Sequence, residues 1–283
     1  EFAETEIELR NDLIFIETLG NILMVAIRNR QFFQEKMAQE SLRRELEVAE
    51  TIQKQLLISD FTHFKDIDVY GLNLSHQRVG GDFYDVIQKE NGSIFLCIAD
   101  VSGKGIGAAL LMSNLQANLR ALCARYSELP VIVGELNNIL HSITEGDKFV
   151  TLFLARIDLP TRTFTYVNAG HNYPLFLTGG EALRLEVGCM LLGILPDLHI
   201  QQDTLPYLPG DLLFTFTDGV VEQGDPTDEL FGSERLAEEL FRVRHAPARE
   251  VVNQVERTLY AFAREVGPSD DITMLAVKFL SES

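Results

Sequence analysis

The hydrophobic and polar positions of the chain follow one pattern up to about residue 57 and a different one beyond it. Residues 4–57 contain no proline and a single glycine, and they are rich in Glu, Leu, Arg, Gln and Ala, which favour helices. Apolar residues recur there at spacings of three and four, so the segment is predicted to form one long helix or two helices end to end. These positions are Leu9, Leu13, Ile16, Leu19, Leu23, Ile27, Phe33, Met37, Leu42, Leu46, Ala49 and Leu56.

An apolar stripe of this length has to be covered by another surface. It could pack on its own domain, but we favour the seam of a parallel or antiparallel homodimer that also serves as a signalling linker from an upstream domain. Gln39 and Gln53 interrupt the stripe, and polar residues at such positions set the register of a coiled coil. We therefore assign residues 1–58 to a helical linker and dimerisation segment, in a chain that opens without an initiator methionine and reads as a fragment.

From residue 66 the pattern changes to short β-rich runs separated by turns. Strands are predicted at 68–74, 83–88, 94–99, 150–157, 162–168, 174–177, 211–217 and 271–279. Helical periodicity predicts helices at 105–126, 130–144, 233–244 and 247–266. Because the strands come in clusters rather than alternating with helices, we expect an α+β domain over residues 66–281, with antiparallel sheets and helices segregated outside them.

Aspartates follow strand-like runs in four separate segments, at residues 79–85, 98–105, 216–219 and 269–273. Any one of these aspartates alone is more often a turn or cap residue. Four such strand ends together are typical of an all-oxygen metal site. Carboxylates with no histidine or cysteine beside them suit hard cations such as Mg²⁺ or Mn²⁺.

The Asn91-Gly92 pair predicts a two-residue hairpin turn, which brings the first two aspartate segments together at the open end of one hairpin. In that register Asp82 faces Val101, whereas Asp85 shares a face with Asp100. The two glycines before Asp82 allow the backbone to bend. Both Asp82 and Asp85 therefore remain candidates, and we prefer Asp82.

Crowded carboxylates repel one another, and a bound cation or a shared proton relieves the repulsion. Two cations ~3.5–4 Å apart lower the pKa of a bridging water and hold a phosphoryl oxygen. Hydrolysis of a phosphoester is the expected chemistry. Neither a Gly-x-Ser-x-Gly nor a Cys-x5-Arg motif is present, so no covalent enzyme intermediate is expected.

Three segments resemble other functional motifs. Residues 78–83 resemble the Gly-Gly-Asp/Glu-Glu-Phe hairpin of diguanylate cyclases, but Asp82 is followed directly by Phe83, so we reject that function. Residues 102–107 lack the phosphate-loop pattern, although Lys104 and free N–H groups there could contact a substrate phosphate. His171 could act as a general acid, but we favour a structural hydrogen-bonding role.

Composition narrows the choice of partners and compartment. The formal charge is 24 − 42 = −18, which disfavours nonspecific binding to nucleic acid or anionic lipid. Cys97, Cys123 and Cys189 lie in apolar surroundings and are expected to be buried free thiols in a reducing, cytoplasmic compartment. The apolar stretch at 13–27 is too short and too polar for a membrane span, and no signal peptide is expected.

Seven segments, taken in order, closely resemble the bacterial SpoIIE-like branch of the metal-dependent serine/threonine phosphatases, which have the type 2C fold. They lie at residues 80–85, 99–105, 151–158, 166–172, 192–194, 217–220 and 269–273, and the resemblance covers about residues 66 to 280. It implies an α-β-β-α sandwich of two antiparallel sheets flanked by helices. It also implies two Mn²⁺ or Mg²⁺ ions in a cleft at one edge of the sandwich.

The same resemblance implies roles for individual residues. Asp100 matches the aspartate that bridges the metals, and Val101 matches the residue whose backbone carbonyl helps to ligate. Asp218 and Asp270 match the remaining aspartates of the second ion, and Asp82 matches a metal aspartate in the Gly-Asp segment. The residues expected just outside the ligands are Asp85 and Asp271.

One position departs from the eukaryotic relatives, which carry a histidine, a general-acid candidate, two residues after the bridging aspartate. Here that position is Ser102, so the general acid stays unassigned.

By analogy, the substrate is phosphoserine or phosphothreonine on a small regulatory protein, such as an anti-sigma-factor antagonist in a partner-switching pathway. Residues 49–57 resemble the entry helix of the family, so regulation through the N-terminal helix is expected. The alternative is a catalytically silent signalling or binding module with the same fold that acts through a helical dimer. The presence of all the expected aspartates argues against that alternative.

Overall fold

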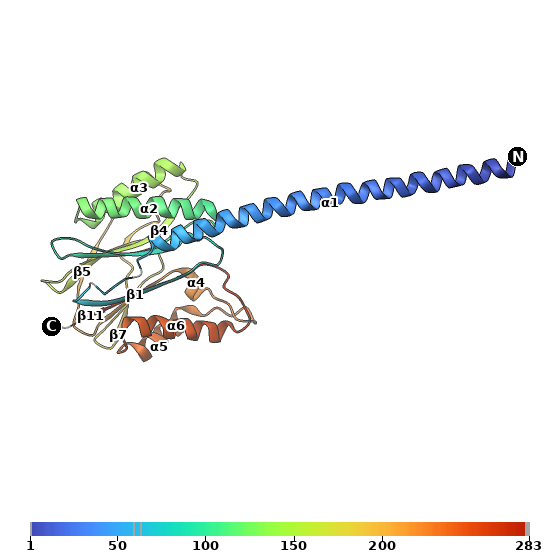
Figure 1. The fold of residues 1–283 in the computed structure, drawn as a ribbon. Helices are drawn as coiled ribbons and strands as arrows, with labels where there is room; N and C mark the ends of the chain where they lie inside the picture. Colours follow the sequence, from blue (N-terminus) through green and yellow to red (C-terminus); the bar gives the residue numbers. More distant parts are fainter. Residues whose placement is uncertain (1, 59, 63, 281–283) are drawn as a thin grey trace. The chain divides into compact units, whose positions relative to one another are not determined.

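The computed structural model describes residues 2–58, 60–62 and 64–280, with side chains from residue 15 onward (Figure 1). The chain divides into two compact units, one up to Glu50 and one from Thr51. Helix α1, Phe2–Leu56, makes up the first unit and continues into the second. The long N-terminal helix predicted from the sequence is therefore confirmed as a single helix.

Apolar side chains of α1 are exposed along much of its length. The larger ones within the first unit are Phe15, Ile16, Leu19, Ile22, Leu23, Met24, Val25, Ile27, Phe32, Phe33, Met37, Leu42 and Val48. They include most of the stripe read from the sequence; its first members, Leu9 and Leu13, lie outside the part whose side chains are described. In the described part of the chain, no helix is both long and apolar enough to cross a membrane.

The second unit is built on two β-sheets. One sheet is antiparallel throughout and has the order β1 (Ile67–Leu74), β11 (Ile272–Phe279), β10 (Leu212–Phe216), β6 (Leu175–Thr178) and β7 (Glu181–Arg184). The other has the order β2 (Phe83–Gln88), β3 (Ile94–Val101), β4 (Val150–Asp158), β5 (Thr163–Ala169) and β8 (Gly188–Cys189), with β9 (Asp203–Pro206) also paired to β5. Only the short β5–β8 pairing is parallel among the described strands.

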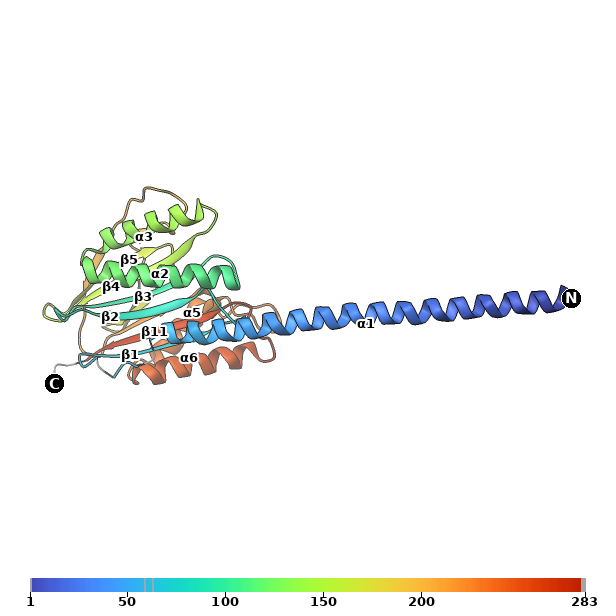
Figure 2. The same ribbon diagram turned by 45° about the horizontal axis from the view of Figure 1, so that its top comes forward.

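The two sheets pack face to face over an apolar core that contains a cluster of aromatic rings. Phe164 lies 5.0 Å from Phe176 and 6.0 Å from Phe279 between ring centroids. Helices cover the two outer faces, as Figures 1 and 2 show. The helices α2 (Ile106–Arg125) and α3 (Leu129–Thr144) cover the sheet that contains β3, while α5 (Gly232–Val243) and α6 (Ala248–Ala263) cover the sheet that contains β10. The predicted α+β sandwich flanked by helices is confirmed.

Four short elements were not predicted from the sequence. They are β7, β8, β9 and the single turn of helix α4, Asp218–Val221. Each has two to four residues, which is too short for a periodic pattern to be recognisable. The three cysteines are free, and Cys97 and Cys123 are buried as predicted, whereas Cys189 is half-buried.

Candidate metal centre

The hairpin of β2 and β3 determines which aspartates can meet. Its turn is a three-residue loop, because Lys89 N–H donates to Ser93 O at 2.9 Å and Gly92 N–H donates to Lys89 O at 3.0 Å. Gly92 has a φ of 86°, the left-handed conformation of a glycine in a bulged hairpin loop. The predicted two-residue turn is therefore wrong by one residue, and so is the register derived from it.

In the observed register Phe83 pairs with Ala99, so Asp82 lies level with Asp100 at the open end of the hairpin. Residues directly opposite one another share a face of the sheet. Asp82 and Asp100 therefore point to the same side without any irregular bend. The preference for Asp82 as a ligand stays a prediction; it rested on the glycines, whereas the observed register is what places Asp82 level with Asp100.

Asp85 lies on the opposite face from Asp100. It pairs with Cys97, and its fully buried carboxylate accepts hydrogen bonds from Arg120 Nε at 2.6 Å and Arg120 Nη2 at 2.8 Å. Arg120 belongs to α2, so this bidentate ion pair fastens α2 to its sheet. The expectation that Asp85 shares a face with Asp100 and lies just outside the ligands is contradicted.

Asp82 and Asp100 are adjacent ionisable groups in a largely buried position. Burial raises the pKa of Asp82 well above its ordinary value, and Asp100 and Asp271 raise it further, while hydrogen bonds from Thr217 and Thr273 oppose the shift. Burial also raises the pKa of Asp100 to about 6, helped by the negative charge of Asp218. Carboxylates crowded in this way favour a shared proton or a bound cation.

The second sheet brings Asp218 and Asp270 to the same place. Asp218 follows β10 at the start of α4, and Asp270 precedes β11. Gly219 packs so closely on this neighbouring segment that a Cβ there would lie 2.0 Å from Asp271 O. Burial, followed by the charges of Glu222 and Asp270, raises the pKa of Asp218.

Both carboxylate oxygens of Asp271 accept hydrogen bonds from the backbone of the segment between β1 and β2. Its Oδ1 accepts a hydrogen bond from His76 N–H at 2.7 Å, and its Oδ2 accepts one from Gly81 N–H at 3.0 Å. A Cβ on Gly80 would lie 2.1 Å from the same Oδ2, so only glycine fits there. These contacts suit the supporting position expected for Asp271 next to Asp82.

The carbonyl of Val101 lies at the end of β3 beside the Gly-Gly pair. A Cβ on Gly81 would lie 2.7 Å from Val101 O, so this glycine lets the two strands approach. The next residue, Ser102, accepts a hydrogen bond at its Oγ from Phe149 N–H at 2.9 Å and donates its own N–H to Phe149 O at 2.9 Å. Ser102 thus anchors the turn that follows β3.

Lys104 is a basic side chain that pairs with one of these carboxylates, Asp270. Its Nζ lies 2.9 Å from Asp270 Oδ2 and donates to Ser269 O at 3.0 Å. The hydrogen bond to Asp270 raises the pKa of Lys104, and the charges of Asp270, Asp271 and Asp218 act in the same direction.

His171 lies near the site but has a structural environment. Its Nδ1 is 2.8 Å from Thr151 Oγ1, and Thr151 is the cross-strand partner of Asp100. Burial lowers the pKa of His171 to about 4, against the opposing effect of the Phe216 carbonyl. Its buried Nε2 has no hydrogen-bond partner. A neutral imidazole in this position supports the structural role over that of a general acid.

The donor set is chemically suited to a hard divalent cation. Carboxylates from both sheets raise one another's pKa, and neither imidazole nor thiolate accompanies them. Across the described side chains, no group of three or more His, Cys, Asp or Glu is already arranged so that it could hold a metal ion. Instead, individual carboxylates have internal partners, such as Thr217 for Asp82 and Lys104 for Asp270. Asp82, Asp100, Asp218, Asp270 and the carbonyl of Val101 are the groups that could hold such an ion.

Two residues support the site through contacts that the sequence did not predict. Thr217 Oγ1 donates to Asp82 Oδ2 at 2.7 Å and accepts from Thr273 N–H at 3.0 Å, which joins β10 and β11 to the Gly-Asp segment. Gln53, near the end of α1, binds both backbone groups of Gly80, at 2.7 Å and 3.1 Å. Thr217 lies inside the segment singled out for Asp218, but no local sequence pattern predicts its contact with Asp82 or that of Gln53 with Gly80.

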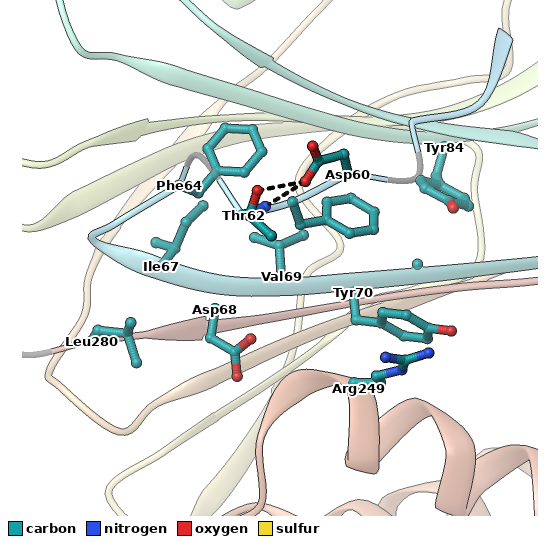
Figure 3. A pocket seen from close by; sticks show the side chains of 12 residues that line it. Asp60, Thr62, Phe64, Ile67, Asp68, Val69, Tyr70, Tyr84, Arg249 and Leu280 are labelled. Atoms are coloured by element: carbon teal, nitrogen blue, oxygen red, sulfur yellow. Dashed lines mark hydrogen bonds between the residues drawn. The ribbon is translucent and has the colours of Figure 1, made fainter. Parts of the chain in front are cut away.

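A separate hollow of about 590 Å³ lies along the edge strand β1 (Figure 3). On one side Arg249 stacks on Tyr70, with 5.3 Å between the guanidinium and the ring centroid, and Asp68 lies nearby. On the other side Thr62 donates to Asp60 Oδ1 through both its N–H and its hydroxyl. None of the candidate metal aspartates lines this hollow, so it is not part of the centre.

Residues 90–280 match the family described as Stage II sporulation protein E (SpoIIE). Protein IcfG of Synechocystis sp. is 30% identical over 264 residues, which are 83% of this chain and 41% of that protein. Phosphoserine phosphatase RsbU of Bacillus subtilis is 29% identical over 186 residues, which are 65% of this chain and 55% of that protein. The chain thus spans about half the length of these curated relatives.

Among solved structures, the SiaA-PP2C domain of Pseudomonas aeruginosa superposes with a TM-score of 0.75 at 24% sequence identity. The superposition covers 86% of this chain and 98% of that one. At this level of identity the likeness establishes the type 2C phosphatase fold. The fold that the motifs implied is confirmed.

Proposed function

Because the chain belongs to the SpoIIE family of protein phosphatases, we propose that it hydrolyses phosphoserine or phosphothreonine on a small regulatory protein with two bound Mn²⁺ or Mg²⁺ ions. The observation that carries this proposal is the gathering of Asp82, Asp100, Asp218 and Asp270 from both sheets at one edge of the sandwich. RsbU, named a phosphoserine phosphatase, supports the choice of substrate class.

We assign the bridging position between the ions to Asp100, with the carbonyl of Val101 beside it. Asp218 and Asp270 would hold the second ion, and Asp82 would complete the set from the Gly-Asp segment. Divalent ions bound there supply an activated water nucleophile and neutralise phosphoryl oxygens.

The chain's own residues prepare this chemistry. Thr217 orients the Asp82 carboxylate, since its hydroxyl donates to Oδ2. Asp271 holds Gly81 N–H and so fixes the backbone on which Asp82 is carried. Helix α2 begins next to the site with no side-chain cap and no acidic residue in its first turn, so its N–H groups and Lys104 are available to an anionic phosphate.

Regulation through α1 is part of the proposal. Gln53 lies in the last turns of α1, and its side-chain amide binds the N–H and the C=O of Gly80, two residues before Asp82. Gln116 of α2 also donates to Leu56 O at 2.8 Å. A rotation or shift of the helix end therefore acts directly on the backbone that carries a candidate metal ligand.

We also propose that the exposed apolar stripe of α1 is the seam of a homodimer and that its packing carries the signal. The three free thiols support a reducing compartment such as the cytoplasm. The substrate would be a phosphorylated regulatory protein of a partner-switching pathway, of the kind to which an anti-sigma-factor antagonist belongs.

The test is turnover of a phosphopeptide or of p-nitrophenyl phosphate by the whole chain. We expect activity that requires Mn²⁺ or Mg²⁺, stops on chelation and is abolished in Asp100→Asn. Asp228→Asn is the matched control, because Asp228 is an exposed loop residue with a φ of 62°, which asparagine tolerates. No turnover by the folded chain would favour the silent binding module, and turnover that needs no metal would contradict the proposed mechanism.

A further inference from the structure

Lys104 forms an ion pair inside the carboxylate group assigned to the metals. Its ammonium lies 2.9 Å from Asp270 Oδ2 and also donates to the carbonyl of Ser269 at 3.0 Å. Asp270 is one of the proposed ligands of the second ion, so one of its oxygens is engaged by a cation that belongs to the protein. A divalent ion that binds this oxygen competes with Lys104 for it.

The ion pair between Lys104 and Asp270 can open at little cost. The side chains of Lys104 and Asp270 are 47% and 45% exposed, and an ion pair so accessible to water contributes little to stability. Lys104 lies between Gly103 and Gly105, whose φ values are 97° and 76°, a conformation that glycine adopts without strain. The ammonium can therefore leave Asp270 without disturbing the buried core of either sheet.

The charges around the Lys104 ammonium determine which partner it can take when it leaves Asp270. Besides Asp270, the carboxylates of Asp271 and Asp218 act on Lys104, and Lys148 approaches the same turn, with its Nζ 3.0 Å from the position of a Cβ on Gly103. Once a divalent cation neutralises these carboxylates, the ammonium is repelled from them. A substrate phosphate bound at the uncapped start of α2 would then offer the ammonium a new anionic partner.

We propose that Lys104 is an exchangeable counter-cation, which pairs with Asp270 in the metal-free site and moves to an oxygen of the substrate phosphate when a divalent ion takes that carboxylate. This inference rests on the proposed function, because it assumes that Asp270 is a metal ligand. The proposal predicts opposite effects of one side chain: Lys104 weakens metal binding and strengthens phosphate binding. A residue that only supported the fold would change both in the same direction.

The test measures Mn²⁺ binding to the whole chain by calorimetry, after chelation and without substrate. We expect Lys104→Gln to bind Mn²⁺ about three- to tenfold more tightly, because a competing positive charge is removed. Lys104→Arg keeps the charge and should stay within about twofold of the unmodified chain. Lys65→Gln is the control, since Lys65 is exposed and precedes the end of β1 that lies opposite the Asp270 end.

A second measurement tests the phosphate half of the proposal. At saturating Mn²⁺, Lys104→Gln should raise the KM for p-nitrophenyl phosphate by about threefold or more, while Lys65→Gln leaves it unchanged. Equal or weaker Mn²⁺ binding by a Lys104→Gln variant with an unchanged Tm would overturn the exchange. An unchanged KM would overturn the move to phosphate. If the unmodified chain binds no Mn²⁺, it is the proposed function that fails.

Discussion

Thr217 Oγ1 donates a 2.7 Å hydrogen bond to Asp82 Oδ2, and this bond ties the end of β10 to the segment that precedes β2. The two residues come from different sheets, so the bond holds the edge of the sandwich together where the carboxylates meet. It also favours the ionised form of a buried carboxylate, which is the form that binds a cation.

Replacing Thr217 with valine should weaken Mn²⁺ binding by about tenfold or more, because Asp82 loses a hydrogen bond to its charged form worth about 1.5 kcal/mol. Calorimetric titration of the metal-free chain measures the change. Thr217→Ser retains the hydroxyl and should restore most of the affinity. Thr215→Val is the control on the same face of β10, because Thr215 makes only a long 3.5 Å contact to Leu275 O. Equal losses in both valine variants would contradict the role of this bond.

The stability of the metal-free chain should depend on pH through Asp100. Burial raises its pKa in the folded chain to about 6, above its ordinary value of 3.8, so the folded state binds more protons than the unfolded state between these values. Stability from this group is therefore present at low pH and lost as the pH rises through about 6. We expect the Tm in chelator to fall by roughly 3–8 °C between pH 5 and pH 8.

Asp100→Asn removes one of the carboxyl groups with a raised pKa and so shows how much Asp100 contributes. In chelator this variant should be more stable than the unmodified chain at pH 8 and should show a flatter dependence of Tm on pH. Mn²⁺ should raise the Tm of the unmodified chain at pH 8 but not that of Asp100→Asn, because an ion that binds only the folded state stabilises it. A pH dependence of the same size in both proteins would contradict this origin.

The hairpin illustrates how far the sequence determines the site. The apolar runs were enough to place β2 and β3 and to bring two aspartate segments together. The sequence did not determine the length of the turn, because Asn91-Gly92 fits either a two-residue turn or a bulged loop of three residues. That one residue decides the face of every side chain on β2, and it separates Asp85 from Asp100.

Contacts between distant segments could not be read from the sequence at all. Thr217 meets Asp82, and Gln53 meets Gly80, only because of how the strands are ordered and where α1 ends. Local patterns carry no information about strand order. The family resemblance supplied the grouping of the aspartates, which neither spacing nor periodicity could give for Asp218 and Asp270.

The ion pair of Arg120 with Asp85 should matter for stability and not for catalysis. Asp85 is fully buried, whereas the Arg120 side chain is 50% exposed. Arg120→Met would leave a buried carboxylate without its cation and should lower the free energy of unfolding by about 3 kcal/mol, as measured by urea denaturation. The Mn²⁺ affinity of the folded protein should not change. Arg184→Met removes one partner of an exposed pair with Glu186 and should cost at most about 1 kcal/mol.

Gln53 offers the most direct test of regulation through α1. Gln53→Leu keeps the size of a buried side chain but loses both hydrogen bonds to Gly80, so the backbone that carries Asp82 is no longer held by the helix. We expect Mn²⁺ binding to weaken by about tenfold and turnover at subsaturating Mn²⁺ to fall in proportion, with partial recovery at high Mn²⁺. Gln55→Leu is the control, because Gln55 is an exposed residue two positions further along the same helix. If Gln53→Leu retains the metal affinity of the unmodified chain, α1 does not act on the site through Gly80, and regulation would have to run through the contact of Gln116 with Leu56.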